Sequence, residues 1–413
     1  MRTRIEPTFR QTAAGDEAEA IMRRCVHCGL CNAVCPTYQL LGDERDGPRG
    51  RIDLIMQVFE GRHWTEATRD HLDRCLHCAG CETACPSGVS YTRLLEIGRS
   101  VLSRRPRPLA DRLRRAALSR LLPRRRLFGW ALGLARWTGP LAPKLLGVRV
   151  PPRTRLRSPP STELAPIGAE PVLMPSGCVE PVLAPATQAA LARVLAVLGM
   201  RLEIVDIGCC GALPHHLDDA HASRRAARRT IDALSAALDR HGARSVAVTG
   251  SGCAAFMSRY ASLFADDADY AGKAARVAQA TRDPAELISP DRERLRAASA
   301  GGAAVRLVYQ APCTQQHARR LRGLVEPILD AVGYTLLPAT EAHLCCGAGG
   351  AYSLLQPKIA GMLRARKLGH LCAQAPDGIA SANIGCIAHL SDPQAPPVRH
   401  WLEWVAPRLR GEA

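Results

Sequence analysis

The sequence predicts an α + α/β fold, in which an α-helical N-terminal domain precedes a duplicated α/β domain. Two observations lead to this fold class. Helical segments bracket two copies of one cysteine run within the first hundred residues. From residue 171 onwards, apolar strands alternate with helices in two rounds about 135 residues apart. The expected domains are residues 1–100, a basic and proline-rich linker over 101–168, and two α/β repeats over 169–301 and 302–413.

The duplicated cysteine run has the pattern C-x2-C-x2-C-x3-C-P and starts at Cys25 and again at Cys75. Two-residue spacers bring three thiolates to one [4Fe–4S] cluster, and the fourth cysteine, before the proline, ligates the other cluster. The predicted ligand sets are Cys25, Cys28, Cys31 and Cys85, and Cys75, Cys78, Cys81 and Cys35. Structural zinc favours ligand pairs and disulfides favour a secretory context, so the pattern argues against both.

Three helices are expected around these runs, over residues 16–24, 52–59 and 65–73. The first leads into Cys25, and the third leads into Cys75. Helices that bracket two clusters predict an α-helical ferredoxin domain. His27 and His77 lie between ligands at matched positions, where a polar side chain shapes cluster potential and solvation.

Composition is consistent with a metal-binding protein of the cytoplasm. The 413 residues include seventeen cysteines but only five phenylalanines, and that many thiols in a reducing compartment usually hold metal. Met1 to Ala20 has no apolar core typical of a signal peptide. The sequence contains no run of eighteen apolar residues, so we expect no segment that spans a membrane. The formal net charge of +17 suits an acidic partner, anionic lipid or nucleic acid, or an arginine-rich solvated surface.

Positive charge is concentrated between Arg104 and Arg126, where ten arginines accompany a single acidic residue. Leucines at helical spacing over 109–122 predict an amphipathic helix. One interpretation is a helix that packs on its own protein with the arginines in solvent. The other is a surface for a partner, or for the inner face of the plasma membrane, formed by Arg124, Arg125, Arg126, Trp130 and Trp137.

Beyond residue 171, strands are expected at 172–174, 204–207, 246–249, 305–309, 335–337 and 379–382, and helices at 187–198, 218–241, 254–264, 316–332 and 356–374. Each strand is followed by cysteine, or leads towards it, at matched spacings in the two repeats. Ligands gather at the carboxyl ends of strands in open α/β sheets. Two further metal sites are therefore predicted: Cys178, Cys209, Cys210 and Cys253, and Cys313, Cys345, Cys346 and Cys386. Buried structural cysteine is the alternative.

The C…CCG…C pattern resembles the cysteine-rich CCG domain of the heterodisulfide reductase B subunit, in which five thiolates hold a non-cubane cluster. Gly250 and Asn383 stand where that family has the first cysteine of a final C-x-x-C. Four thiolates remain in each repeat. They suit a cubane, a modified cluster or zinc.

The whole arrangement resembles the iron–sulfur subunit of bacterial glycolate oxidase, through Cys25-Val-His-Cys28-Gly, Asp46-Gly-Pro-Arg-Gly-Arg51 and Ser381-Ala-Asn-Ile-Gly-Cys386. That resemblance implies a partner with FAD that oxidises glycolate to glyoxylate, and transfer of its electrons through this chain towards a quinone or another acceptor. Lactate-oxidising complexes and anaerobic glycerol-3-phosphate dehydrogenase share the architecture. No phosphate-binding fingerprint follows a strand, so we expect no flavin, no nicotinamide and no catalytic residue in this chain.

A basic nucleic-acid-binding protein with structural clusters is the rival from another class. Few aromatic stacking residues and no recognition module argue against it, and nucleic acid is not an expected partner. Among the remaining candidates, His215, His216 and His343 flank the paired cysteines and suit hydrogen bonds around a cluster. Cys372 has no counterpart in the first repeat, and we expect it in the core.

Overall fold

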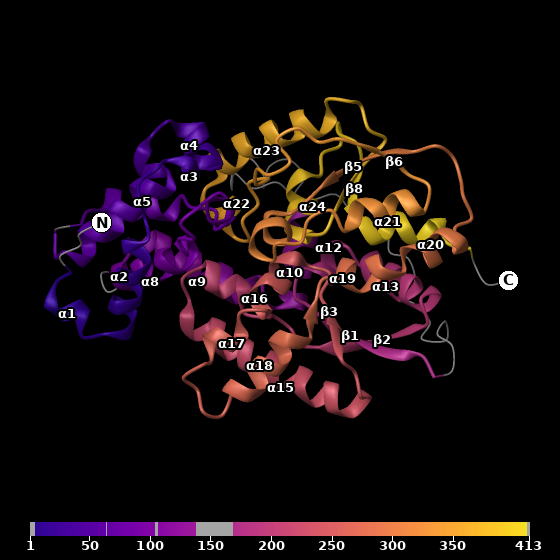
Figure 1. The fold of residues 1–413 in the computed structure, drawn as a ribbon, viewed down its shortest axis with the longest axis horizontal. Coiled ribbons are helices and arrows are strands. Elements are labelled where there is room, and N and C mark those ends of the chain that lie inside the picture. The colour runs from indigo at the N-terminus through magenta and orange to yellow at the C-terminus, as the bar shows by residue number, and fades with distance from the viewer. Residues whose placement is uncertain (1–4, 63, 104–105, 138–167, 411–413) are drawn as a thin grey trace.

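The computed structural model describes residues 5–62, 64–103, 106–137 and 168–410 (Figure 1). A helical N-terminal region is followed along the chain by two four-stranded parallel sheets, which confirms the predicted fold class. In Figure 1 the helical region lies at the left, the first sheet with its helices below, and the second above. The proline-rich part of the predicted linker, residues 138–167, and Arg104 lie outside the described residues.

The helical region buries its apolar core between three longer helices. Its elements are α1 (Pro7–Arg10), α2 (Ala13–Arg23), α3 (Leu30–Ala33), α4 (Pro36–Leu41), η1 (Glu44–Asp46), α5 (Pro48–Phe59), α6 (Glu66–Asp73), α7 (Gly80–Thr83) and α8 (Tyr91–Leu102). The side chains of Met22, Ile55 and Leu94, from α2, α5 and α8, are fully buried in one cluster. The predicted helices at 16–24, 52–59 and 65–73 correspond to α2, α5 and α6.

Each cysteine run begins with a tight loop that follows the end of a helix, α2 for the first run and α6 for the second. The proline after the first run begins α4, where a missing N–H costs nothing. His27 and His77, at matched positions, have φ values of 56° and 53°. Two positions later, Gly29 and Ala79 have φ values of 80° and 58°. This left-handed backbone is uncommon for residues with a Cβ, and its recurrence in both copies shows that each loop makes the same turn.

The first α/β repeat contains β1 (Glu170–Ser176), β2 (Met200–Asp206), β3 (Ser245–Ala247) and β4 (Thr281–Arg282), in the parallel order β2-β1-β3-β4. Its helices are α12 (Glu180–Leu183), α13 (Ala186–Val197), α14 (Ala212–His216), α15 (Ala220–His241), α16 (Ser251–Met257), α17 (Tyr260–Leu263), α18 (Ala271–Ala280), α19 (Pro284–Ile288), η3 (Ser289–Asp291) and α20 (Arg292–Ala298). Strand β1 pairs with β2 along its whole length, from Glu170 opposite Met200 to Ser176 opposite Asp206.

The second repeat has the equivalent order β6-β5-β7-β8 and is again parallel. Its elements are β5 (Arg306–Gln310), η4 (Thr314–Ala318), α21 (Val325–Ala331), β6 (Thr335–Leu337), α22 (Tyr352–Leu355), α23 (Pro357–Cys372), β7 (Gly378–Ser381), α24 (Ile384–Leu390), β8 (Val398–His400), α25 (Trp401–Val405) and η5 (Ala406–Arg408). The matching order confirms the duplication that the cysteine spacing predicts.

The two repeats share one hydrophobic core. Leu191 and Leu195 of the first repeat pack in a single cluster with Leu307, Ile328 and Trp401 of the second, and all five side chains are fully buried. Full burial of an aliphatic side chain stabilises a protein by about 1.5–3 kcal/mol. A core of this kind fixes the sheets against each other, so that their cysteine-bearing edges keep a defined relation.

Three predictions about local structure are wrong or incomplete. The helix expected at 316–332 is divided into η4, a π-helix, and α21, because Arg320 and Gly323 between them have left-handed backbone. The helix expected at 254–264 is divided into α16 and α17. Strands β4 and β8 were not predicted, since each is only two or three residues long.

Candidate metal centres

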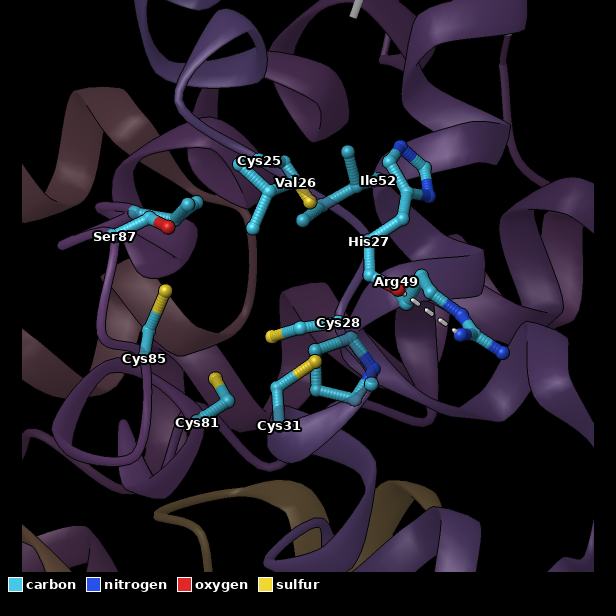
Figure 2. A pocket seen from close by; sticks show the side chains of 13 residues that line it. Cys25, Val26, His27, Cys28, Cys31, Arg49, Ile52, Cys81, Cys85 and Ser87 are labelled. Carbon is cyan, nitrogen blue, oxygen red and sulfur yellow. Dashed lines mark hydrogen bonds between the residues drawn. The ribbon is translucent and has the colours of Figure 1, made fainter.

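The first predicted ligand set surrounds one surface pocket. Cys25, Cys28, Cys31 and Cys85 line it, together with Cys81, and Figure 2 shows their sulfur atoms around a common space. The chain thus brings the fourth cysteine of the second run to the first three cysteines of the first run. Cys28 is exposed, so this centre opens to solvent.

The second predicted set lies deeper. Cys35, Cys75 and Cys81 are buried, and Cys78 is half-buried. Burial, followed by the neighbouring Cys78, Cys75 and Cys35 thiols, raises the pKa of Cys81 well above its ordinary value. Iron binding would stabilise the thiolate form of such buried cysteines, because the cation compensates the negative charge of the thiolates that bind it. Cys81 also lines the first pocket, so the two candidate cluster sites adjoin.

A buried polar network supports the second centre from behind. Asp46 accepts from Arg74 at 3.0 Å and lies 3.0 Å from Nδ1 of His71. The Arg51 guanidinium donates to the Thr37 hydroxyl at 3.1 Å and to the His71 carbonyl at 2.7 Å. Asp46 and Arg51 are the ends of the Asp-Gly-Pro-Arg-Gly-Arg stretch. The structure therefore gives this stretch a positioning role, because Thr37 also lies 3.3 Å from the Cys35 sulfur.

The first α/β repeat gathers its cysteines at the carboxyl edge of its sheet. Cys178 follows β1, Cys209 and Cys210 follow β2, and Cys253 lies in α16 after β3. Hydrogen bonds from the thiols of Cys178 and Cys210 lower the pKa of Cys209 to about 3. The Gly211 N–H also donates to the Cys209 sulfur at 3.4 Å. The geometry thus favours a thiolate at Cys209, the form that binds metal.

The second repeat makes the same arrangement. The sulfurs of Cys313 and Cys345 lie 3.8 Å apart, and those of Cys346 and Cys386 lie 3.1 Å apart. The Gly347 N–H donates to the Cys345 sulfur at 3.5 Å, as Gly211 does in the first repeat. All seventeen cysteines lie in the described part of the chain, and there each is a free thiol. Both sets therefore suit a metal centre; the metal they hold stays a prediction.

The second α/β repeat lies directly against the second cysteine run. Burial, then the neighbouring Cys313 thiol, raises the pKa of Cys78 well above its ordinary value. Cys78 and Cys313 pack against one apolar cluster that includes Leu76 and Cys345. Thr83, within the second run between Cys81 and Cys85, hydrogen bonds to His317 at 3.0 Å. No local pattern in the sequence points to His317, because its partners lie far away along the chain.

The first α/β repeat meets the same run through histidines. Nε2 of His215 lies 3.1 Å from the Glu96 carboxylate. The ring of His216 lies 5.7 Å from that of His77. Burial lowers the pKa of His216 to about 4, so the ring is neutral at pH 7. His215, His216 and His77 thus pack between the helical region and the first repeat. The remaining two histidine candidates do not join them: His343 accepts from His317 through its carbonyl, and His27 is exposed at the first centre.

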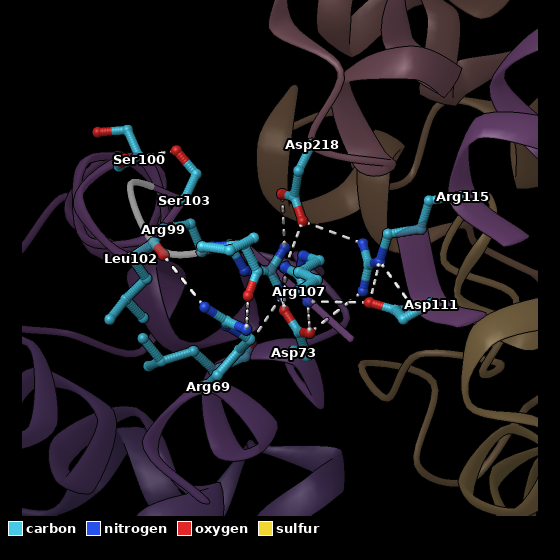
Figure 3. Close-up of polar contacts among 12 residues, drawn as sticks. Arg69, Asp73, Arg99, Ser100, Leu102, Ser103, Arg107, Asp111, Arg115 and Asp218 are labelled. Carbon is cyan, nitrogen blue, oxygen red and sulfur yellow. Dashed lines mark hydrogen bonds and ion pairs between the residues drawn. The ribbon is translucent and has the colours of Figure 1, made fainter. Parts of the chain in front are cut away.

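The basic segment contacts the rest of the chain through one buried arginine and exposes two of its leucines. In α9 (Leu109–Leu121) the side chain of Arg115 reaches Asp73 at 3.1 Å and Asp218 at 3.0 Å (Figure 3). Leu109 and Leu113 are 68% and 62% exposed. The helix packs on its own protein, and its exposed Arg112, Arg114 and Arg120 agree with the expectation that the arginines face solvent. The expectation is wrong for Arg115, which is buried because Asp73 and Asp218 attract it, and for Leu109 and Leu113, which face solvent.

The following helix, α10 (Arg125–Trp137), carries the predicted surface residues. Trp130 and Trp137 are more than four-fifths exposed, and with Leu127 and Leu134 they form a stripe along the helix. Arg124 and Arg126 are exposed. Arg125 is exposed as well, but it also donates to the Ser176 hydroxyl at 2.7 Å.

Cys372 lies at the end of α23 and packs against the core cluster around Leu371 and Leu390, as expected for a structural cysteine. Among the described residues, no helix combines the length and the apolar character that a bilayer span needs.

A helical region with eight convergent cysteines, joined to two α/β repeats with four each, defines an iron–sulfur protein of the dicluster type with paired cysteine-rich domains. Residues 21–89 match the 4Fe-4S dicluster domain family, and residues 172–258 and 307–391 match the cysteine-rich domain family. The dicluster match implies two [4Fe–4S] clusters in the helical region. The chain belongs to the family of glycolate oxidase iron–sulfur subunits, since it is 42% identical over 414 residues to the glycolate oxidase iron-sulfur subunit of Escherichia coli (strain K12), with full coverage of both chains.

Two more distant relatives show the same architecture or part of it. The probable glycolate oxidase iron-sulfur subunit of Bacillus subtilis (strain 168) is 28% identical over 404 residues, which cover 91% of this chain and 89% of the relative. Lactate utilization protein A of Shouchella clausii is 26% identical over 184 residues, which cover 44% of this chain and 73% of that protein.

Proposed function

We propose that this chain is the electron-transfer subunit of a glycolate oxidase. A partner subunit with FAD oxidises glycolate to glyoxylate, and this chain carries the electrons towards a quinone or another acceptor. The observation that carries the proposal is the contact between the second cysteine run and the second repeat, where Cys78 lies beside Cys313. This contact places two of the predicted ligand sets side by side, which supports the transfer of electrons between them.

The two ligand sets of the helical region differ in burial: the first is more exposed and the second is mostly buried. The first set, with exposed Cys28, opens to the surface beside the side chain of Val26, which is 67% exposed. The second set is mostly buried, and the second repeat lies behind it. A bound [4Fe–4S] cluster exchanges one electron at a time, with a potential set by burial and by hydrogen bonds to sulfur. This order supports entry of electrons at the exposed first set.

The exposed stripe on α10 supports a contact with an anionic membrane surface. Exposed Trp130 and Trp137 lie on the same helix as Arg126, a combination typical of segments that bind at a bilayer interface. Such a contact would bring the chain near a lipid-dissolved acceptor without any spanning helix.

Titration of the anaerobically purified complex with glycolate tests the substrate. Glycolate should produce reduced-cluster EPR signals in amounts that follow the glycolate added, and lactate should produce them poorly. Efficient reduction by lactate alone would instead support the alternative of a lactate-oxidising complex, to which the likeness with lactate utilization protein A points. Reduction by neither acid would contradict the proposal.

A further inference from the structure

The first α/β repeat lacks a cysteine at position 250, and a carboxylate lies beside that position. A Cβ added to Gly250 would lie 3.7 Å from Oε2 of Glu180 and 3.9 Å from the sulfur of Cys253. Glu180 begins α12, two residues after Cys178. The Glu180 carboxylate therefore borders the space in which the side chain of a fifth cysteine would start, between two residues of the four-thiol site.

Among the described residues, Glu180 forms no ion pair that would explain its position. Its Oε2 accepts a hydrogen bond from the Thr249 hydroxyl at 2.8 Å. Within the part of the chain that the structure describes, its charged neighbour is another acid, Glu403. Glu180 is half-buried. Carboxylates in such surroundings are normally paired with a cation or coordinate a metal.

The second repeat provides an internal comparison. Gln315 follows Cys313 at the same spacing at which Glu180 follows Cys178, and its amide donates to Asp283 at 3.1 Å. The position equivalent to Gly250 is Asn383, whose Oδ1 accepts from the Gly385 N–H at 2.8 Å and whose Nδ2 donates to Thr314 at 3.3 Å. The amides of Gln315 and Asn383 are thus engaged with protein groups, and neither residue offers a carboxylate.

We propose that Glu180 supplies an oxygen ligand to the metal centre of the first repeat, in the place of the missing fifth thiolate. This inference rests on the proposed function only in taking that centre to be a metal site. Carboxylate oxygen binds both iron and zinc, so the ligand role does not depend on which metal the thiols hold. The two repeats then carry unequal centres: four thiolates and a carboxylate in the first, four thiolates in the second.

An anionic oxygen ligand has a predictable electronic effect. It adds negative charge and is harder than a thiolate, so it stabilises the more oxidised state of a redox-active metal. Loss of the carboxylate charge should therefore raise the reduction potential of the first-repeat centre and leave that of the second unchanged.

The test uses the full chain, purified anaerobically, with iron, zinc and labile sulfide measured and EPR recorded through a reductive titration. The double variant Cys209→Ser/Cys210→Ser identifies the share of metal and the signal that belong to the first repeat. Glu180→Gln should lower metal affinity there at least tenfold, roughly the smallest effect of altering groups around a metal ligand, or should raise the potential of the remaining centre. Thr249→Val removes the hydrogen bond to Glu180 but not the carboxylate, and should have a smaller effect than Glu180→Gln.

Rescue by thiolate makes the test specific. Gly250 has φ −83° and ψ 102°, a backbone that cysteine adopts without strain. Glu180→Gln/Gly250→Cys should recover the metal content that Glu180→Gln loses, whereas Glu180→Gln/Asn383→Cys should not. Equal metal content, spectrum and potential in wild type and Glu180→Gln would overturn the ligand role while leaving electron transfer by the chain intact. The ligand role would also be overturned if Cys209→Ser/Cys210→Ser left the metal content of the chain unchanged.

If Glu180→Gln does not fold, the Gly250→Cys variant alone tests whether Glu180 is a ligand. A fifth thiolate that displaces the carboxylate should change the first-repeat EPR signal. An unchanged signal, or an unchanged metal affinity if the centre is EPR-silent, would contradict the proposal.

Discussion

The hydroxyl of Thr83 lies 3.0 Å from Nδ1 of His317, although 234 positions separate the two residues in the chain. The opposite nitrogen of the same ring donates to the His343 carbonyl at 2.8 Å. A single imidazole thus joins the second cysteine run to the two segments that carry Cys313 and Cys345. The contact holds a candidate [4Fe–4S] site of the helical region against the metal site of the second repeat.

Replacement of His317 should weaken this junction. His317→Ala removes the hydrogen bonds to the His343 carbonyl and the Thr83 hydroxyl, and a hydrogen bond contributes about 0.5–1.5 kcal/mol to stability. We expect a lower unfolding midpoint in denaturant, together with slower electron transfer beyond the ferredoxin clusters. Thr83→Ser keeps the hydroxyl and serves as the matched control. Equal stability and equal transfer rates in all three proteins would show that the contact has no such role.

The crossover of the fourth cysteine predicts which cluster each substitution damages. Cys35→Ser should remove the EPR signal of the cluster held by Cys75, Cys78 and Cys81, because Cys35 belongs to that ligand set. Cys85→Ser should instead damage the cluster held with Cys25. The two variants are each other's control, and the opposite pattern would exclude the crossover.

The arginine contacts of α9 predict a pH-dependent docking. Burial alone would raise the pKa of Asp73, but the hydrogen bond from Arg107 and the charges of Arg99, Arg107 and Arg115 outweigh it and lower the pKa. A carboxyl whose pKa is lowered by folding stabilises the protein above its unfolded pKa of about 3.9. That contribution is lost as the pH falls through the folded value.

Asp73→Asn should therefore destabilise the chain at neutral pH and reduce the pH dependence of unfolding below about pH 4. The loss should not exceed about 3 kcal/mol, the lower end for a broken buried pair, because Asp218 still holds Arg115. Urea unfolding across this pH range measures both effects, with Asp70→Asn, which replaces another carboxylate of α6, as the control. A slope unchanged by Asp73→Asn would contradict the account.

The stripe on α10 predicts binding to anionic vesicles. Each arginine near such a surface contributes about 1 kcal/mol, less at high salt, so Arg124→Gln/Arg126→Gln should weaken partition about thirtyfold. Arg125 is left in place because it bonds Ser176. The exposed pair Arg225→Gln/Arg229→Gln on α15 removes the same charge elsewhere. Vesicle flotation of the assembled complex should separate the two variants, and equal flotation would exclude a specific role for α10.

Much of the architecture can be predicted from local patterns. The cysteine spacing fixes two turns with three thiols each, and alternating strands and helices place Cys178, Cys209 and Cys253 at one edge of a sheet. Contacts between distant segments cannot be read this way. Such contacts depend on how the folded domains pack. Examples are the pairing of Thr83 with His317, the approach of Glu180 to position 250 and the attraction of Arg115 to Asp218. For the same reason the prediction for α9 failed at Arg115 and Leu109: hydrophobic spacing indicates one face of a helix but does not reveal the acidic residues that bind an arginine on it.

We propose a path in which electrons from the substrate-oxidising partner pass through the helical region into the second repeat. It is tested most directly by Cys345→Ser in the intact complex, reduced with glycolate while EPR and reduction of an added quinone are followed. We predict that both ferredoxin cluster signals still develop, since their ligands are untouched, and that quinone reduction falls sharply. Quinone reduction at the wild-type rate, with metal lost from the second repeat, would contradict the claim.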